Sequence, residues 1–235
     1  MPVLNIDQFL AAVDRAVEGR YQSAMARVER LRSTEPDAHP RRLTALLVRR
    51  TQSELGAVAA VSGATAAAPG IGTATTLATA AADATWTITR LAELIMAIGI
   101  AHGHDAPSME ERKAWVLSTL AIANGATGTL DDLAGNWSRL GGVRLLAQLG
   151  PARLDAFNSG LVTRLAGRLM ARGAALSASR LAPFGIGAAV GAAGNIAATR
   201  LVGRAAADLF TATPLRRRYE DVLDLDGEEV TVEGS

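Results

Sequence analysis

The chain of 235 residues contains no cysteine and only three histidines. The absence of cysteine excludes disulfide bonds and thiolate metal sites. The histidines are His39, His102 and His104, and the last two flank a glycine, so their side chains would point in divergent directions. No further histidine is left to complete a metal site or to activate a nucleophile in a hydrolytic triad. We therefore expect no metal, no cofactor and no enzymatic activity.

Strand signals and aromatic residues are also scarce. Alternating runs of valine, isoleucine, threonine or tyrosine between turn residues do not occur before residue 219. Hydrophobic residues make up 49% of the chain but aromatic residues only 4%, so most of the apolar content is alanine, leucine, valine and isoleucine. Alanine is the strongest helix former, and a chain of this length can bury a large core. The composition predicts an all-α fold in a single compact helical domain.

Charge of both signs is present but unevenly placed, and the formal net charge is +1. Residues 139–204 hold nine arginines against one acid, Asp155, whereas residues 220–233 hold seven acids and no base. The arginine-rich segment has few of the aromatic residues that stack on bases, so we expect no nucleic-acid partner. We expect the acidic tail to be mostly unstructured, or at most a short hairpin around residues 226–227, and its charge to screen the arginines.

One short phrase occurs twice in the chain. Residues 68–72 read Ala-Pro-Gly-Ile-Gly, and residues 182–187 read Ala-Pro-Phe-Gly-Ile-Gly. Proline sets the backbone for a helix start, and small residues after it allow two helix backbones to approach closely. Each phrase is followed by a lone polar residue in an apolar setting, Asp83 in the first copy and Asn195 in the second. The repeat predicts two close-packed helices, each initiated by proline and glycine.

Periodicity and turn signals divide the chain into helices and three regions. Residues 108–111 form a capping box that opens a helix, and Gly103 is placed to end the helix before it. The helices are expected at residues 6–32, about 41–68, 71–103, 109–124, 131–149, from 151 onward, and 183–210. The regions are an N-terminal amphipathic helix (1–38), a helical domain (39–212) and an acidic tail (213–235).

Two uncharged runs are long enough to raise the question of membrane crossing. They cover residues 55–82 and 181–199, and a transmembrane helix needs about 20 apolar residues. Both runs consist mostly of alanine, glycine and threonine, and Pro69 divides the first into two short pieces. We expect buried core helices, with shallow membrane contact as the alternative reading.

A first group of candidate residues serves helix packing and buried polar contacts. A buried acid is costly unless it is paired, so Asp83 should find a base in Arg90 or in the last helix. Gly187 and Gly191 lie four residues apart on one helix face, which we expect to pack on the helix after Pro69. The group comprises Pro69, Gly70, Gly72, Asp83, Arg90, Gly103, Pro183, Gly187, Gly191, Asn195 and Arg200.

A second group of candidates forms a basic stripe. Arg164, Arg168 and Arg172 follow one another in steps of four, and Arg180 lies beyond them. Leucines at positions 161, 165 and 169 form an apolar face beside the stripe. A basic stripe beside an apolar one is typical of a helix on an anionic membrane surface. The alternative is an ordinary solvated face.

Several of these segments resemble the EcsC family of bacterial proteins. The likeness rests on residues 68–72 with the small-residue run to Asp83, on residues 100–105 (Ile-Ala-His-Gly-His-Asp), and on residues 183–191 continued through Asn195, Arg200 and Gly203. It spans roughly residues 45–212, with a histidine before Gly103 where we would expect an aromatic residue. The resemblance implies an α-helical protein associated by name with an ABC-exporter locus, and it does not imply an enzyme.

Together these features predict a non-enzymatic helical protein. We expect it to bind a lipid or another apolar ligand, or to dock peripherally on the inner face of the membrane in support of export. Anionic lipid, an apolar small molecule and a second copy of the chain are the partners considered. A soluble adaptor or self-associating scaffold without lipid contact is the alternative, and an enzyme acting on lipid ranks third. The first residues lack a basic segment followed by an apolar core, so we expect a cytoplasmic location.

Overall fold

The computed structural model describes the backbone of residues 6–66, 73–106, 108–125, 146, 149–179 and 186–211, and the side chains of residues 9–58, 85–106, 108–125, 146, 149–165 and 196–211. This part of the chain is helical and contains no strand, which confirms the all-α prediction. The helices are α1 (Ile6–Gly19), α2 (Tyr21–Thr34), α3 (Pro40–Ala66), α4 (Thr73–Ala101), α5 (Met109–Ala123), α8 (Pro151–Ser179) and α9 (Ile186–Thr211).

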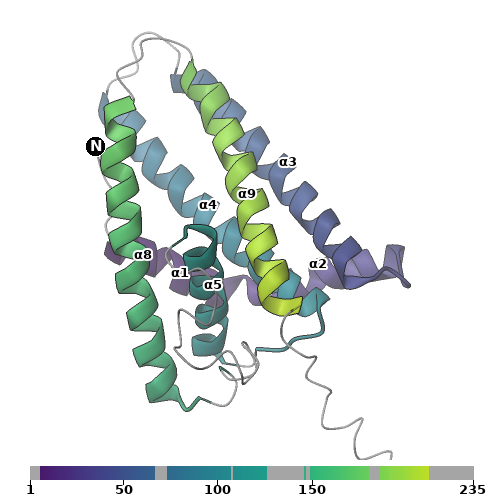
Figure 1. Cartoon of the computed structure of the whole chain (residues 1–235). Helices are drawn as coiled ribbons and strands as arrows, with labels where there is room; N and C mark the ends of the chain where they lie inside the picture. Colours follow the sequence, from purple (N-terminus) through teal and green to yellow (C-terminus); the bar gives the residue numbers. More distant parts are fainter. Residues whose placement is uncertain are drawn as a thin grey trace, which may run out of the picture.

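Helix α4 is the central element of the fold. Helices α3 and α9 lie side by side and run in opposite directions, and α4 passes behind α9 (Figure 1). Helices α1 and α2 both pack against α4. The shorter helix α5 fills the space between α1, α4, α8 and α9. Every residue from position 91 to 99 is buried, and all of them except Glu93 are apolar, which is the pattern of a helix in a core. The second half of α4 therefore organises the packing of its neighbours.

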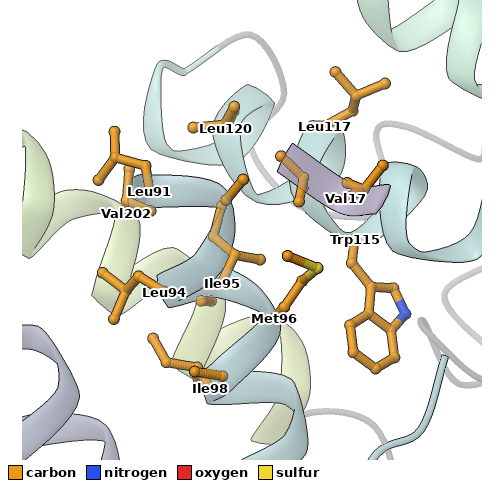
Figure 2. Close-up of a cluster of buried hydrophobic side chains, with 14 of the residues drawn as sticks. Val17, Leu91, Leu94, Ile95, Met96, Ile98, Trp115, Leu117, Leu120 and Val202 are labelled. Atoms are coloured by element: carbon orange, nitrogen blue, oxygen red, sulfur yellow. The ribbon is translucent and has the colours of Figure 1, made fainter. Parts of the chain in front are cut away.

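The core is one continuous cluster around this segment. Figure 2 shows Leu94, Ile95, Met96 and Ile98 of α4 pointing toward different neighbours, with Trp115 of α5 beside them. Residues from α1, α2, α3, α5, α8 and α9 join the same cluster. Burial of such side chains contributes about 1.5–3 kcal/mol each relative to exposure. The two N-terminal helices thus share the core of the rest of the chain.

A glycine allows three helices to meet closely at the end of α4. A Cβ atom built on Gly99 would lie 2.6 Å from Trp115 of α5 and 2.9 Å from Phe210 of α9. The two aromatic rings contact each other edge to face, with centroids 4.9 Å apart, an arrangement that aromatic pairs favour. Gly99 is therefore needed because it lacks a Cβ atom, which lets the helices pack closely, and not because of a special backbone angle.

Helix α9 packs on the expected neighbour α4 and also on α3. It contacts α4, but its longer interface is with α3. At that interface a Cβ on Gly203 would come within 2.4 Å of Val48, so a glycine does bring two backbones together there. The surroundings of Gly187 and Gly191 lie outside the described side chains.

The prediction of one helix over residues 6–32 is wrong, because the helix is interrupted at Arg20, between α1 and α2. The backbone hydrogen bonds Arg20 N to Ala16 O and Ala24 N to Arg20 O, both 2.9 Å, continue on either side of the bend. Buried residues also continue across it, from Val17 in α1 to Tyr21 in α2. The unbroken apolar pattern concealed this interruption.

Other helix ends agree with the sequence. Ser108 caps α5 by accepting a hydrogen bond from the Glu111 backbone at 3.1 Å, and α8 begins at Pro151. In the part of the chain that is described, no helix is both long enough and apolar enough to cross a membrane. The predicted helix at 131–149, apart from positions 146 and 149, and the acidic tail lie outside the described residues.

Candidate functional site

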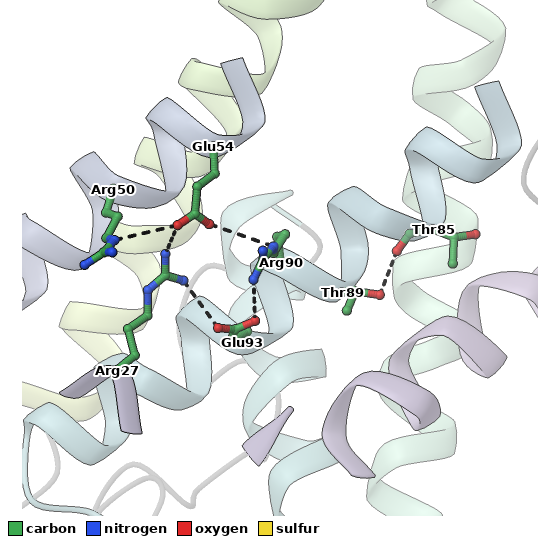
Figure 3. A network of polar contacts seen from close by, with 7 residues as sticks. All are labelled: Arg27, Arg50, Glu54, Thr85, Thr89, Arg90 and Glu93. Atoms are coloured by element: carbon green, nitrogen blue, oxygen red, sulfur yellow. Dashed lines mark hydrogen bonds and ion pairs between the residues drawn. The ribbon is translucent and has the colours of Figure 1, made fainter. Parts of the chain in front are cut away.

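Charged side chains from three helices gather beside the apolar core. Helix α2 contributes Arg27, α3 contributes Arg50 and Glu54, and α4 contributes Arg90 and Glu93 (Figure 3). The pairs on α3 and α4 are separated by four and three residues, so each pair lies on one helix face. The packing of α2 and α3 against α4 then brings the three sets together.

Arg27 is the centre of this charge cluster. Its side chain is only 5% exposed, and its Nη1 lies 3.4 Å from Oε1 of Glu93, while its Nη2 donates to Oε1 of Glu54. Burial lowers the pKa of Arg27, and the two nearby carboxylates oppose that shift. An arginine remains protonated under such conditions, so the structure holds a buried cation between two acids.

Glu93 uses both of its carboxylate oxygens. Its Oε2 accepts from Nη1 of Arg90 at 2.9 Å, and its Oε1 faces Arg27. The Arg90 guanidinium also lies 5.3 Å from the centre of the Trp86 ring, within the range of a cation–π contact. Arg90 and Glu93 are thereby held in fixed positions on α4.

Glu54 is held less tightly. Apart from Arg27, it faces Nε of Arg50 and Nε of Arg90, each at 3.8 Å, which is too long for a hydrogen bond. Oε2 of Glu54 and Nε of Arg90 are both buried and have no hydrogen-bond partner among the described residues. The cluster therefore contains unused donor and acceptor capacity at its centre.

An open cleft adjoins the cluster, and we call it the arginine cleft. Its volume is about 340 Å³, within the ~300–1,000 Å³ range of ligand sites. It is lined by Arg20, Ser23, Ala26, Arg27, Arg30, Arg50, Glu54, Arg90 and Glu93. Five arginines against two glutamates leave a formal excess of three positive charges. Planar guanidinium groups match the oxygens of carboxylates and phosphates, so the cleft is suited to an anion.

The lining residues do not form a set for catalysis. Ser23 is the one hydroxyl among them, and no histidine lies beside it to act as a base. The two glutamates are paired with arginines and are not arranged as an acid and a base with room for a substrate between them. The arrangement of this cleft favours binding over chemistry.

A second polar cluster lies at the end of α4. Gly103 has φ 83°, and the hydrogen bonds His104 N to Gly99 O and Gly103 N to Ile100 O, each 3.0 Å, form a Schellman motif. Glycine adopts this left-handed conformation without strain. Gly103 therefore ends the helix as predicted.

Both histidines of this cluster are buried. Nε2 of His102 lies 3.2 Å from the hydroxyl of Thr44, and Nε2 of His104 lies 3.1 Å from the carbonyl oxygen of Phe210. Burial lowers the pKa of His102 and of His104. Burial disfavours the charged form of both rings. These contacts join α4 to α3 and α9.

Tyr21 completes the polar contacts at this end. Its hydroxyl donates to Oδ1 of Asp105 at 2.7 Å and accepts from the backbone N–H of Ala106 at 3.3 Å. Burial, reinforced by the bond to Asp105, raises the pKa of Tyr21 to about 12. Arg112 stacks over the ring at 3.8 Å. These bonds anchor α2 to the loop after α4.

Only a few of the predicted site residues fall within the described side chains. Arg90 belongs to the arginine cleft, and Arg164 and Arg200 are exposed on α8 and α9. Six further candidates lie in described helices, but their side chains are outside the described set: Asp83, Arg168, Arg172, Gly187, Gly191 and Asn195. Five others lie wholly outside the described residues: Pro69, Gly70, Gly72, Arg180 and Pro183. The predicted pairing of Asp83 with a base therefore stays a prediction, while Arg90 pairs with Glu93 and Glu54.

The sequence analysis missed Arg27, Arg50 and Glu54. A signal was present, because Arg27 falls on the buried face of α2 between Ala24 and Val28, where an unpaired cation would be costly. Its acidic partners lie 27 and 66 residues away. Only the packing of three helices brings them together.

No protein-family model, curated protein or solved structure matches this chain. The resemblance to the EcsC family stays a prediction from the residues quoted above.

Proposed function

We propose that this chain is a non-enzymatic binding protein whose arginine cleft takes the phosphate group of an anionic lipid, and that it docks peripherally on a membrane through this contact. The observation that carries the proposal is the cleft itself, in which five guanidinium groups exceed two carboxylates beside a cavity of about 340 Å³. An uncompensated group of cations attracts an anion over several ångströms, and arginine is well suited to phosphate oxygens.

A lipid is favoured over a fully water-soluble anion by the neighbouring sequence. The uncharged run of residues 55–82 begins directly after Glu54, which lines the cleft. In the chain, the basic residues of the cleft are thus followed by an uncharged segment, the order that suits a ligand with a phosphate group and an apolar part. This order of residues supports a lipid with its headgroup at the arginines.

The basic stripe of α8 is a second contact for the same function. Its exposed member in the described part is Arg164, but Leu161 and Leu165 beside it are buried in the core, where α8 packs on α5. The leucines of this part of α8 are thus not available to enter a membrane. We propose that the stripe adds attraction to anionic headgroups, without insertion of this face.

Sedimentation with vesicles tests the proposal. The protein should bind vesicles of phosphatidylcholine that contain an anionic lipid and should not bind phosphatidylcholine alone. Each arginine near an anionic surface contributes about 1 kcal/mol, so the double variant Arg30→Ser/Arg50→Ser should bind at least about tenfold more weakly. Both side chains are exposed and line the cleft, so the fold should be retained.

The matched control is Arg41→Ser/Arg49→Ser, which removes two exposed arginines outside the cleft lining. If both double variants lose the same affinity, binding is a general effect of charge and the cleft is not the site. If the wild-type protein binds neither kind of vesicle, the adaptor or scaffold function replaces the proposal.

A further inference from the structure

The two glutamates of the arginine cleft have different roles, and the difference is visible in their contacts. The Glu93 side chain is 5% exposed, and each of its carboxylate oxygens faces a separate guanidinium, at 2.9 and 3.4 Å. Removing this acid would leave the buried Arg27 with less compensation. Glu93 is therefore a permanent counter-ion of the fold.

Glu54 is placed to move. Its side chain is 28% exposed and lies among the three arginines from α2, α3 and α4 (Figure 3). It makes one hydrogen bond, to Arg27, and its two other ion pairs are 3.8 Å long. An oxygen of an incoming anion would find the same three guanidinium groups that Glu54 now faces.

We infer that Glu54 is a displaceable internal counter-ion, which occupies the position of a ligand's anionic group and makes the cleft selective for a phosphomonoester dianion over a monoanion. The inference rests on the proposed function and refines its ligand. Exchange of the Glu54 carboxylate for another monoanion replaces one charge by an equal one. A dianion brings more charge and more acceptor oxygens to guanidinium groups that offer several donors each, so it gains from the exchange.

The substitution Glu54→Gln tests this role. Glutamine keeps the size of the side chain and an oxygen that can accept from Arg27, but it removes the competing charge. Inorganic phosphate, titrated calorimetrically at pH 7.5, should bind the variant at least about fivefold more tightly, the factor for one unit charge about 4 Å away even in bulk water. Acetate should bind the wild-type protein far more weakly than phosphate does. The control Glu29→Gln changes an exposed acid of α2 outside the cleft lining and should leave the affinity for phosphate unchanged.

Vesicles distinguish a lipid headgroup from a free phosphate. Phosphatidic acid presents a phosphomonoester, whereas phosphatidylglycerol presents a monoanionic diester. The inference predicts preferential binding to phosphatidic acid at equal surface charge, and a larger gain for Glu54→Gln on phosphatidylglycerol, which cannot displace the carboxylate. Binding of inorganic phosphate without binding to either vesicle would identify a soluble phosphomonoester as the ligand and would refute the membrane part of the proposed function alone.

The two failures can be told apart. If the wild-type protein binds phosphate and anionic vesicles but Glu54→Gln and Glu29→Gln behave alike, the site stands and the role of Glu54 is refuted. If no variant binds any anion, the proposed function fails as well. Should Glu54→Gln not fold, as judged by circular dichroism, the thermal stability of the wild-type protein decides: phosphate must raise the melting temperature more than acetate at equal ionic strength, and equal shifts would overturn the inference.

Discussion

Helix α4 borders two regions that are built in opposite ways. Around Gly99 the packing is so close that even one added carbon would meet Trp115 at 2.6 Å. Around Arg90 and Glu93, two turns earlier on the same helix, charged side chains line a cleft of about 340 Å³. One region has no space for a ligand, and the other is open and carries unpaired donor capacity.

The difference shows which region holds the fold together. Apolar burial stabilises the folded state wherever surfaces fit, whereas a buried ion pair must first overcome the loss of hydration of both ions and is weak evidence for stability. We therefore expect the Gly99 region to account for stability and the arginine cleft for binding. The following predictions test this division, from the largest expected effect to the smallest.

The substitution Trp115→Ala should have the largest effect. Trp115 is completely buried and contacts Phe210 edge to face, so truncation leaves a large void and should lower the free energy of unfolding by about 3–5 kcal/mol. Urea unfolding followed by circular dichroism gives this value. A loss below about 1 kcal/mol would show that the aromatic contact does not organise the core.

The substitution Gly99→Ala tests the opposite error, overpacking. The added methyl group must displace Trp115 or Phe210, and such displacement should cost about 1–3 kcal/mol. Gly160 in α8 offers a matched control, because a Cβ there would meet nothing within 4 Å and alanine should stabilise the helix by about 0.5–1 kcal/mol. Equal effects of the two substitutions would contradict the packing described for Gly99.

Acidification should cause a smaller loss of stability through the buried histidines. The pKa values of His102 and His104 are lowered in the folded state, so between the folded and unfolded values the unfolded chain binds more protons. Stability then falls as the pH drops below about 6.5, the ordinary histidine value. Urea unfolding at pH 7.5 and 5.5 measures this slope, which should be smaller in the variant His102→Gln/His104→Gln. An unchanged slope would assign the pH dependence to other groups.

The substitution Arg50→Ser should have the smallest effect on stability. The side chain is 59% exposed and only 3.8 Å from its acidic partner at the closest approach, and exposed ion pairs contribute about 0–1 kcal/mol. The free energy of unfolding should change by no more than about 0.5 kcal/mol, while phosphate binds more weakly. A large loss of stability would make the cleft part of the structural core and would break the division between the two regions.

Helix starts and ends that depend on residues close together in the chain could be predicted from the sequence. The capping box at Ser108, the helix start at Pro151 and the helix end at Gly103 each depend on contacts within one turn, and all three are present. The bend at Arg20 was missed because the apolar period continues through it into α2. A regular apolar pattern does not by itself reveal whether the chain changes direction.

The candidate site could not be found in the same way. The sequence analysis named Arg90 as a partner of Asp83, seven residues away, whereas its described partners include Glu54 on another helix. It also expected the leucines beside the basic stripe of α8 to form an apolar face toward a membrane, whereas those in the described part are buried in the core. Charged residues that contact each other are separated by up to 66 residues in the chain. A pattern of neighbouring residues cannot predict a contact over such a separation.

The sequence by itself determined that this chain is helical, where most of its helices begin and end, and that it has no cysteine chemistry. Those properties follow from helix propensity, capping and periodicity, which act over one or two turns. Only the tertiary structure decided that Arg27, Glu54 and Glu93 meet, that α9 lies along α3, and that the histidines after α4 are buried. The physical reason is that burial and charge pairing depend on which helix faces come together, and that choice is made by the packing of the whole core.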